Sequence, residues 1–209
     1  MNLIETIGGV PINQCGNLVQ WTSGLSIDAD GDPEAYTPKG TGLDYLANAG
    51  RLGDWWGIAC TPGGIPYIQC ATDPDPGFYV ATTALEDASK DVSDPARYVD
   101  SGRIPFIVLP MKRTFPAKMG NLAFVFNTAN GKYSFAICAD EGPTGQIGEG
   151  SIALANALGI PSNPKHGGCD SGVAFTVFLG SPLDWPQTLD QIVAAGTELA
   201  QQNGLAIPA

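Results

Sequence analysis

Two carboxylates stand at the two ends of a segment rich in glycine and proline. Asp140 follows a mostly apolar run, and Glu149 lies just before Ser151, where a second apolar run begins. We expect a strand before Asp140 and a helix after Ser151, so the loop can fold back and bring both carboxylates to one cleft. Glycosidic bond cleavage needs such a pair, since one carboxylic acid protonates the leaving oxygen and the other carboxylate activates water or attacks. The spacing alone also allows that Asp140 supports the turn and Glu149 complements a helix dipole.

A second acidic group lies at residues 28–32, where Asp28, Asp30 and Asp32 alternate around a glycine. This pattern is similar to a calcium-binding loop, but the twelfth position counted from Asp28 is Lys39, where an EF-hand needs a bidentate glutamate. The segment is therefore not an EF-hand. Three interpretations stay open, namely a solvated turn, an acidic loop that binds substrate and, least favoured, a calcium site.

Other residue types with chemical potential carry weaker signals. Aromatic side chains could stack on sugars or fill the core, and adjacent Trp55 and Trp56 on a strand would point to opposite faces. His166 is the only histidine, and no Gly-x-Ser-x-Gly or Cys-x-x-Cys element occurs, which disfavours serine or cysteine hydrolases and a structural zinc site. Cys60 and Cys70 flank a turn at 61–64 and could face each other across it.

Composition limits the possible classes of function. The 209 residues carry a formal net charge of −11, and 44% of them are hydrophobic. The hydrophobic fraction excludes a disordered chain. The negative charge disfavours a nucleic-acid binder; it suits a cationic partner or serves solubility alone. The longest wholly apolar run, 104–110, is too short to span a membrane, and the first nine residues contain no basic residue and are not expected to be a signal peptide.

Turn signals at intervals of about ten residues predict a mainly β protein. We expect three helices, at 42–49, at 152–158 after an N-cap at Ser151, and at about 187–203. The strands at 122–127, 133–139 and 173–179 are apolar nearly throughout, so we expect them to lie side by side in the core. The full set of expected strands is 55–60, 65–70, 77–82, 104–109, 122–127, 133–139 and 173–179.

Several of these segments resemble glycoside hydrolase family 75, the fungal-type endo-chitosanases. The strongest similarity lies in the strand residues 133–140 and in the block Gly142-Pro143, Ile147-Gly148-Glu149-Gly150-Ser151. Residues 27–31, 35–36, 43–44, 48–50, 78–80, 98–100 and 178–181 also match, so that the resemblance extends from about residue 24 to about residue 200.

The resemblance implies a mostly β fold, a single compact β-barrel suspected to be of the double-psi kind, with a few peripheral helices. Residues 1–23 would form an N-terminal extension, and 24–209 the catalytic domain. The implied activity is endo-cleavage of β-1,4 linkages in chitosan with inversion, without metal or organic cofactor. Asp140 and Glu149 match the family's two essential carboxylates, and we expect Asp28, Asp30, Glu141 and Tyr36 to bind substrate.

From these expectations follow the partner and the place of action. The substrate would be a cationic amino-sugar polysaccharide, with no nucleic acid or membrane partner, and we expect a monomer. We expect the protein to be secreted, and a cytoplasmic location and export without a cleaved signal stay open as alternatives. Two alternative functions stay open. The first is a glycosidase acting on another amino-sugar polymer such as peptidoglycan, for example an exported antibacterial protein. The second is a carbohydrate-binding relative without activity.

The surroundings of the carboxylates predict their roles. The helix dipole beside Glu149 should favour its charged form, as in a general base, while burial and the neighbouring Glu141 should raise the pKa of Asp140, as in a general acid. Inversion requires the two carboxyl groups to stand roughly 6.5–9.5 Å apart.

Overall fold

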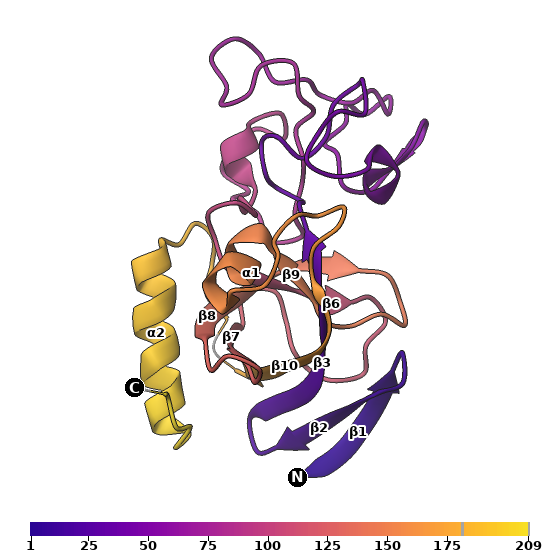
Figure 1. The fold of residues 1–209 in the computed structure, drawn as a ribbon. Helices are drawn as coiled ribbons and strands as arrows, with labels where there is room; N and C mark the ends of the chain where they lie inside the picture. Colours follow the sequence, from indigo (N-terminus) through magenta and orange to yellow (C-terminus); the bar gives the residue numbers. More distant parts are fainter. Residues whose placement is uncertain (181, 209) are drawn as a thin grey trace.

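The computed structural model describes residues 1–180 and 182–208, so Ser181, part of the family resemblance, and Ala209 lie outside the described residues. Six strands form a closed barrel (Figure 1). The barrel closes because the strand at 18–28 pairs in parallel with the strand at 149–151. In barrel order the strands are β3 (Leu18–Asp28), β10 (Cys169–Phe178), β7 (Leu122–Asn127), β8 (Tyr133–Gly142), β6 (Phe106–Pro110) and β9 (Glu149–Ser151).

The apolar strands are buried on both faces, as their sequence predicts. On one face of β6, Ile107 and Leu109 pack in the apolar cluster of the barrel interior. On the other face, Phe106 and Val108 pack in a second apolar cluster outside the barrel. Strands β10, β7 and β8 are neighbours, which confirms the expectation for the three apolar segments. The mostly β barrel with peripheral helices is thus confirmed, and its double-psi character stays a prediction.

Two helices cover the barrel. Helix α1 (Ile152–Leu158) begins at Ser151, whose side chain accepts a hydrogen bond from the Leu154 backbone N–H, and it has the predicted bounds. Helix α2 (Leu189–Gln202) has a capping box at Thr188 and packs on the outer face of β7 and β8 (Figure 1). No helix in the described part of the chain is long and apolar enough to cross a membrane.

The N-terminal residues are part of the same core. Strands β1 (Asn2–Ile7) and β2 (Val10–Cys15) form a hairpin that extends the sheet beyond β3. Ile12 and Trp21 are buried in the barrel interior, so the expected boundary after residue 23 falls inside β3. The sequence analysis missed all three of these strands.

Residues 29–105 form an irregular lobe above the barrel, drawn in purple to magenta in Figure 1. It contains two 3-10 turns and two short strands. Of the strands expected at 55–60, 65–70 and 77–82, only Trp55 lies in a strand and six residues form isolated bridges, because glycine and proline interrupt these segments. Cys60 lies opposite Pro66 rather than Cys70, and the five cysteines are free. The elements are η1 (Leu46–Ala49), β4 (Gly50–Arg51), β5 (Asp54–Trp55) and η2 (Pro95–Arg97).

Candidate active site

Strand β6 sets the relative position of the two predicted catalytic carboxylates. Val108 pairs with Asp140 of β8 on one side and with Glu149 of β9 on the other. Because residues in register share one face of a sheet, both carboxylates start from the outer face of the barrel. Two interstrand spacings separate them, roughly 10 Å along the sheet. Asp140 and Glu149 therefore lie on the same face of the barrel, one on each side of β6.

A β-bulge directs Asp140. Cys138 pairs with Ile107 and Asp140 with Val108, so Ala139 is an extra residue in β8. Without it, Asp140 would lie opposite the next residue and face the interior, since successive side chains alternate between the two faces. The bulge thus places a carboxylate where the alternation of β8 would otherwise have buried it inside the barrel.

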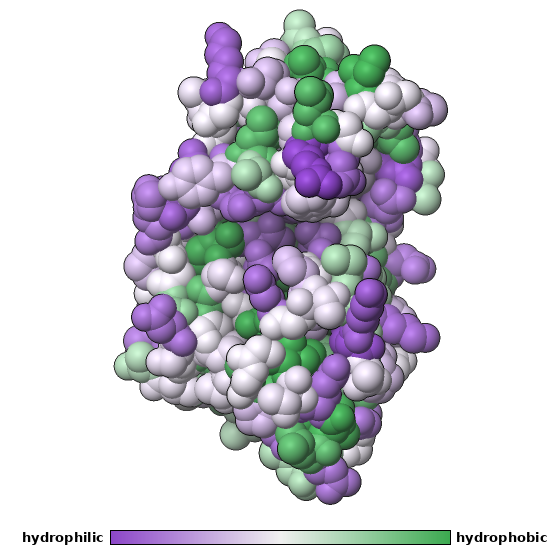
Figure 2. All heavy atoms as spheres, turned by 90° about the vertical axis from the view of Figure 1, so that its right-hand side faces the viewer, coloured by the Kyte–Doolittle hydropathy of each residue, from purple (hydrophilic) through white to green (hydrophobic). Residues whose placement is uncertain are grey.

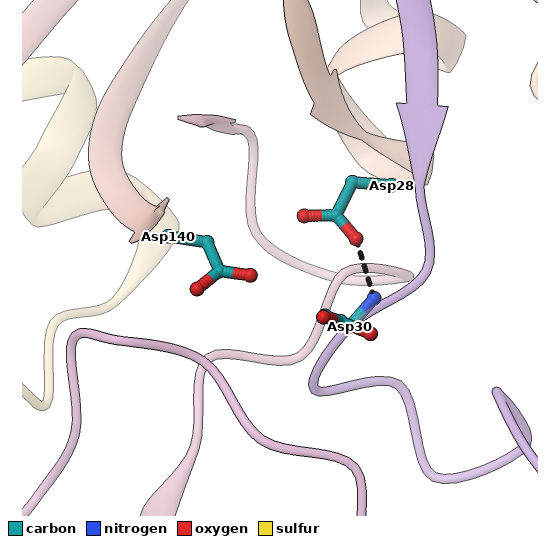
Figure 3. Close-up of side chains that lie close together, drawn as sticks. All are labelled: Asp28, Asp30 and Asp140. Carbon is teal, nitrogen blue, oxygen red and sulfur yellow. Dashed lines mark hydrogen bonds between the residues drawn. The ribbon is translucent and has the colours of Figure 1, made fainter. Parts of the chain in front are cut away.

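Two further carboxylates join Asp140 at the end of β3. Carboxylate oxygens of Asp28, Asp30 and Asp140 lie within 4.8 Å of one another. Figure 3 shows Asp28 and Asp140 pointing toward each other, with Asp30 below them on the loop that follows β3. The Asp30 backbone N–H donates to Asp28 Oδ1 at 2.8 Å, which ties the loop to the strand.

The irregular lobe covers this cluster. The Ala84 N–H donates to Asp140 Oδ1 at 2.9 Å, as does the Glu141 N–H, and the buried hydroxyl of Tyr36 donates to Asp30 Oδ1 at 2.6 Å. Asp28 is only 7% exposed and Asp140 9%. Figure 2 shows a hollow between the lobe and the barrel with hydrophilic residues in its floor.

Burial dominates the electrostatics of the site. Removal from water raises the pKa of Asp28 to about 6 and that of Glu149 to about 8, and nearby carboxylates add to both shifts. Burial, followed by repulsion from Asp28, also raises the pKa of Asp30 and Asp140 well above the ordinary range. At neutral pH the site therefore holds protons that exposed carboxylic acids would have released.

No cation in the described part of the chain forms an ion pair with these groups. Among the described residues there are five ion pairs, and none of them includes Asp28, Asp30, Asp140 or Glu149. A buried carboxylate is stable only when it is paired, hydrogen-bonded or protonated. Positive charge supplied from outside the chain would therefore favour the ionised form of these groups. Asp28, Asp30 and Asp140 also offer the oxygen donors that a hard divalent cation prefers.

The expected effect of the helix dipole on Glu149 is wrong. The first N–H groups of α1 are already satisfied, because Ile152 donates to Ser101 Oγ, Ala153 to the Ser101 carbonyl and Leu154 to Ser151 Oγ. Burial instead raises the pKa of Glu149, and within residues 1–180 and 182–208 its carboxylate accepts no hydrogen bond. The expected rise for Asp140 is found, with burial as its main cause.

Two predicted substrate-binding residues have other surroundings than expected. Tyr36 is 2% exposed, so its ring offers no face to a sugar, and its hydroxyl instead holds Asp30. Glu141 accepts a hydrogen bond from Arg113 Nη1 at 2.8 Å, so its charge is paired rather than free for an ammonium group. Asp28 and Asp30, by contrast, lie beside Asp140 as the binding hypothesis requires.

Two adjoining pockets extend from Glu149 along the barrel. The smaller, of about 270 Å³, includes Glu149, and the larger, of about 430 Å³, is lined largely by glycines. Ser26 and Ile147 line both pockets. Glu149 thus lies at the edge of a hollowed surface, whereas Asp28, Asp30 and Asp140 line neither of these two pockets.

Sequence reasoning missed the residues that support the site. Ser101 is buried, donates to the Asp28 carbonyl and accepts from α1, yet it lies in a turn with no distinctive spacing. Asp44 is 4% exposed and adds negative charge near Asp28 and Glu149.

No known family model matches the chain, and a search of the curated proteins finds no match either.

Proposed function

We propose that the chain is a glycoside hydrolase that cleaves β-1,4 linkages within chitosan by an inverting acid/base mechanism. The observation that carries the proposal is the group of four buried or half-buried carboxyl groups that form no ion pair with a cation among the described residues. Chitosan supplies that charge, because its deacetylated units carry ammonium groups near and below neutral pH. The net charge of −11 favours encounter with such a polymer.

Glu149 takes the role of general acid in this proposal. Its pKa of about 8 means that it carries a proton at neutral pH, and no hydrogen bond in the described structure favours its charged form. This proton is available for the leaving oxygen of the glycosidic bond. The pockets beside Glu149 offer room for the sugar units on this side.

Asp140 takes the role of general base. Two backbone N–H groups donate to its Oδ1, and such donors favour a carboxylate. These donors offset part of the rise that burial causes in the pKa of Asp140, and an ammonium group bound beside Asp28 and Asp30 would lower this pKa, so that substrate itself promotes the ionised base. Asp140 and Glu149 lie on opposite sides of β6 and not next to each other, and the water molecule that inversion requires would occupy the space between Asp140 and the sugar.

Release of reducing ends from chitosan, chitin and peptidoglycan, measured in parallel, tests the proposal. We expect activity on chitosan, and the activity should fall as the acetylated fraction of the polymer rises. Variants E149Q and D140N should each lose at least roughly 100-fold in kcat, the usual contribution of general acid or base catalysis. The matched control D190N, at an exposed position on α2, should keep wild-type activity. Activity on peptidoglycan alone would contradict the substrate assignment.

A further inference from the structure

Asp30 differs from the other two carboxylates of the cluster in its free hydrogen-bonding capacity. Asp28 accepts a backbone N–H and Asp140 accepts two, and both are buried. Asp30 is half-buried and accepts a single hydrogen bond, from the Tyr36 hydroxyl, among the residues that the structure describes. An ionised carboxylate can accept about four hydrogen bonds, and a bound ammonium group would favour the ionised form of Asp30, which then has most of this capacity for the ligand.

The Tyr36 side chain is fixed independently of any ligand. Its ring lies in a small apolar cluster of the lobe with Ala35, Ile58 and Ala81, and its carbonyl accepts from the Tyr79 N–H at 2.9 Å. The hydroxyl at the end of this immobile ring donates to Asp30 Oδ1 at 2.6 Å. Tyr36 therefore sets the orientation of the Asp30 carboxylate without reaching the surface.

Gly57 fixes Asp30 from another direction. A Cβ atom added at Gly57 would lie 2.9 Å from Asp30 Oδ2 and 3.1 Å from Oδ1, closer than van der Waals contact allows. The Gly57 N–H donates to the Ala49 carbonyl at 3.1 Å, so the backbone cannot easily retreat. Any residue other than glycine at this position would push the Asp30 carboxylate away from the place that Tyr36 gives it.

We propose that Tyr36 and Gly57 are positioning residues that hold Asp30 as the receptor for an ammonium group of the amino sugar bound next to Asp28 and Asp140. This inference deepens the proposed function and rests on it. In this proposal Asp30 gives the enzyme its preference for deacetylated sugar units. An ammonium group pairs its positive charge with the Asp30 carboxylate, whereas an acetamido group carries no charge. Neither Tyr36 nor Gly57 touches the sugar.

Two pairs of variants test the inference. Y36F removes the hydroxyl that holds Asp30, and its control Y98F removes the hydroxyl of a second buried tyrosine, which donates to the Val92 carbonyl. G57A pushes on Asp30, and its control G63A adds a methyl group where the nearest atom is 3.7 Å away. Thermal unfolding of all four variants shows which of them fold, and G57A decides the matter if Y36F does not fold.

The readouts are kcat and KM on chitosan of low and high acetylation. Y36F and G57A should raise KM for the deacetylated polymer about tenfold, as expected when one hydrogen bond to a charged group is lost, and should lower kcat by less. The rise should be smaller on the acetylated polymer, and the controls should match wild type. Equal effects of Y36F and Y98F, or a rise independent of acetylation, would overturn the inference.

Binding of glucosamine oligosaccharides to the E149Q variant, measured by calorimetry, separates the inference from the proposed function. If the wild type cleaves no chitosan, the proposed function fails, and binding still decides the inference. We expect that Y36F in the E149Q background binds these oligosaccharides about tenfold more weakly, while Y98F leaves the Kd unchanged. Absence of binding, or equal binding by both double variants, would overturn the inference.

Discussion

Asp140 and Glu149 stand on opposite sides of strand β6, each directly paired with Val108. They are nine positions apart in the chain, but their relative position depends on a third strand that comes from a distant part of the sequence. The central strand acts as a rigid spacer, because strands at the middle of a closed barrel are hydrogen-bonded on both sides. In the proposed inverting mechanism the acid and the base must leave room for a water molecule, and the intervening strand keeps the two residues apart.

The roles of the two carboxylates can be separated by chemical rescue. D140A lacks the base, so azide should restore part of its activity by replacing the water on the opposite face of the sugar. E149A lacks the acid, and a substrate with a good leaving group, which needs no proton, should be cleaved by it faster than chitosan. Initial rates with and without azide measure both effects. The reverse pattern would make Glu149 the base and Asp140 the acid.

Replacement of the binding carboxylates should act on affinity. D28N and D30N each remove a negative charge beside the place proposed for an ammonium group, so KM for chitosan should rise more than kcat falls. Steady-state kinetics at constant ionic strength give both constants, and D190N is the exposed control. If a chelator abolishes activity and calcium restores it, a metal ion rather than the sugar amine occupies the cluster.

Gly142 offers a test of the position of Glu149. A Cβ atom at this residue would lie 3.1 Å from Glu149 Oε2 and 3.0 Å from Val108 Cγ1. G142A should therefore displace the Glu149 carboxyl group and lower kcat at least about tenfold, since small errors in the position of a catalytic group are costly. The control G63A has open space around the added methyl group and should keep wild-type kcat. Unchanged kcat in G142A would argue against Glu149 as the acid.

Stability should fall as the pH rises. Folding raises the pKa of Glu149 from 4.5 to about 8, so the folded state binds more protons than the unfolded state between these values. The corresponding stability is fully present below the unfolded pKa and is lost as the pH rises through about 8. Asp28, Asp30 and Asp140 act in the same direction.

Thermal unfolding of the wild type and of E149Q over this pH range measures the effect. The melting temperature of E149Q should depend less on pH than that of the wild type, because glutamine does not titrate. The control E198Q, at an exposed position on α2, should retain the wild-type dependence. A wild-type melting temperature that increases from about pH 5 to about pH 8 would contradict the raised pKa values.

Local signals in the sequence predict the central strands and α1 well. Strand β7 and helix α1 have the expected bounds, since an apolar run ends at a turn in the first case and Ser151 and Gly159 cap the helix in the second. Strand β3 was missed, because its alternating pattern contains polar residues and Gly24. In the lobe, apolar runs bounded by turns looked like strands, but they pack as irregular loops over the barrel.

The sequence predicts the carboxylates of the site, but it does not predict the residues that bury and orient them. The acidic residues at 28–30 and the pair Asp140 and Glu149 have recognisable spacing, and the structure places them around one site. Their pKa values depend on burial by residues far away in the sequence, which no local pattern reveals. The role of Tyr36 likewise follows from the path of the lobe, which turns an aromatic residue inward and leaves only its hydroxyl at the site.

The anomeric configuration of the first products of chitosan cleavage tests the central claim most directly. Time-resolved proton NMR of the wild type acting on chitosan distinguishes the α from the β reducing end before mutarotation mixes them. We expect the α anomer to accumulate first, and neither anomer to accumulate with D140N or E149Q. A β anomer that forms first, or cleavage at wild-type rates by either variant, would contradict an inverting mechanism carried by Asp140 and Glu149.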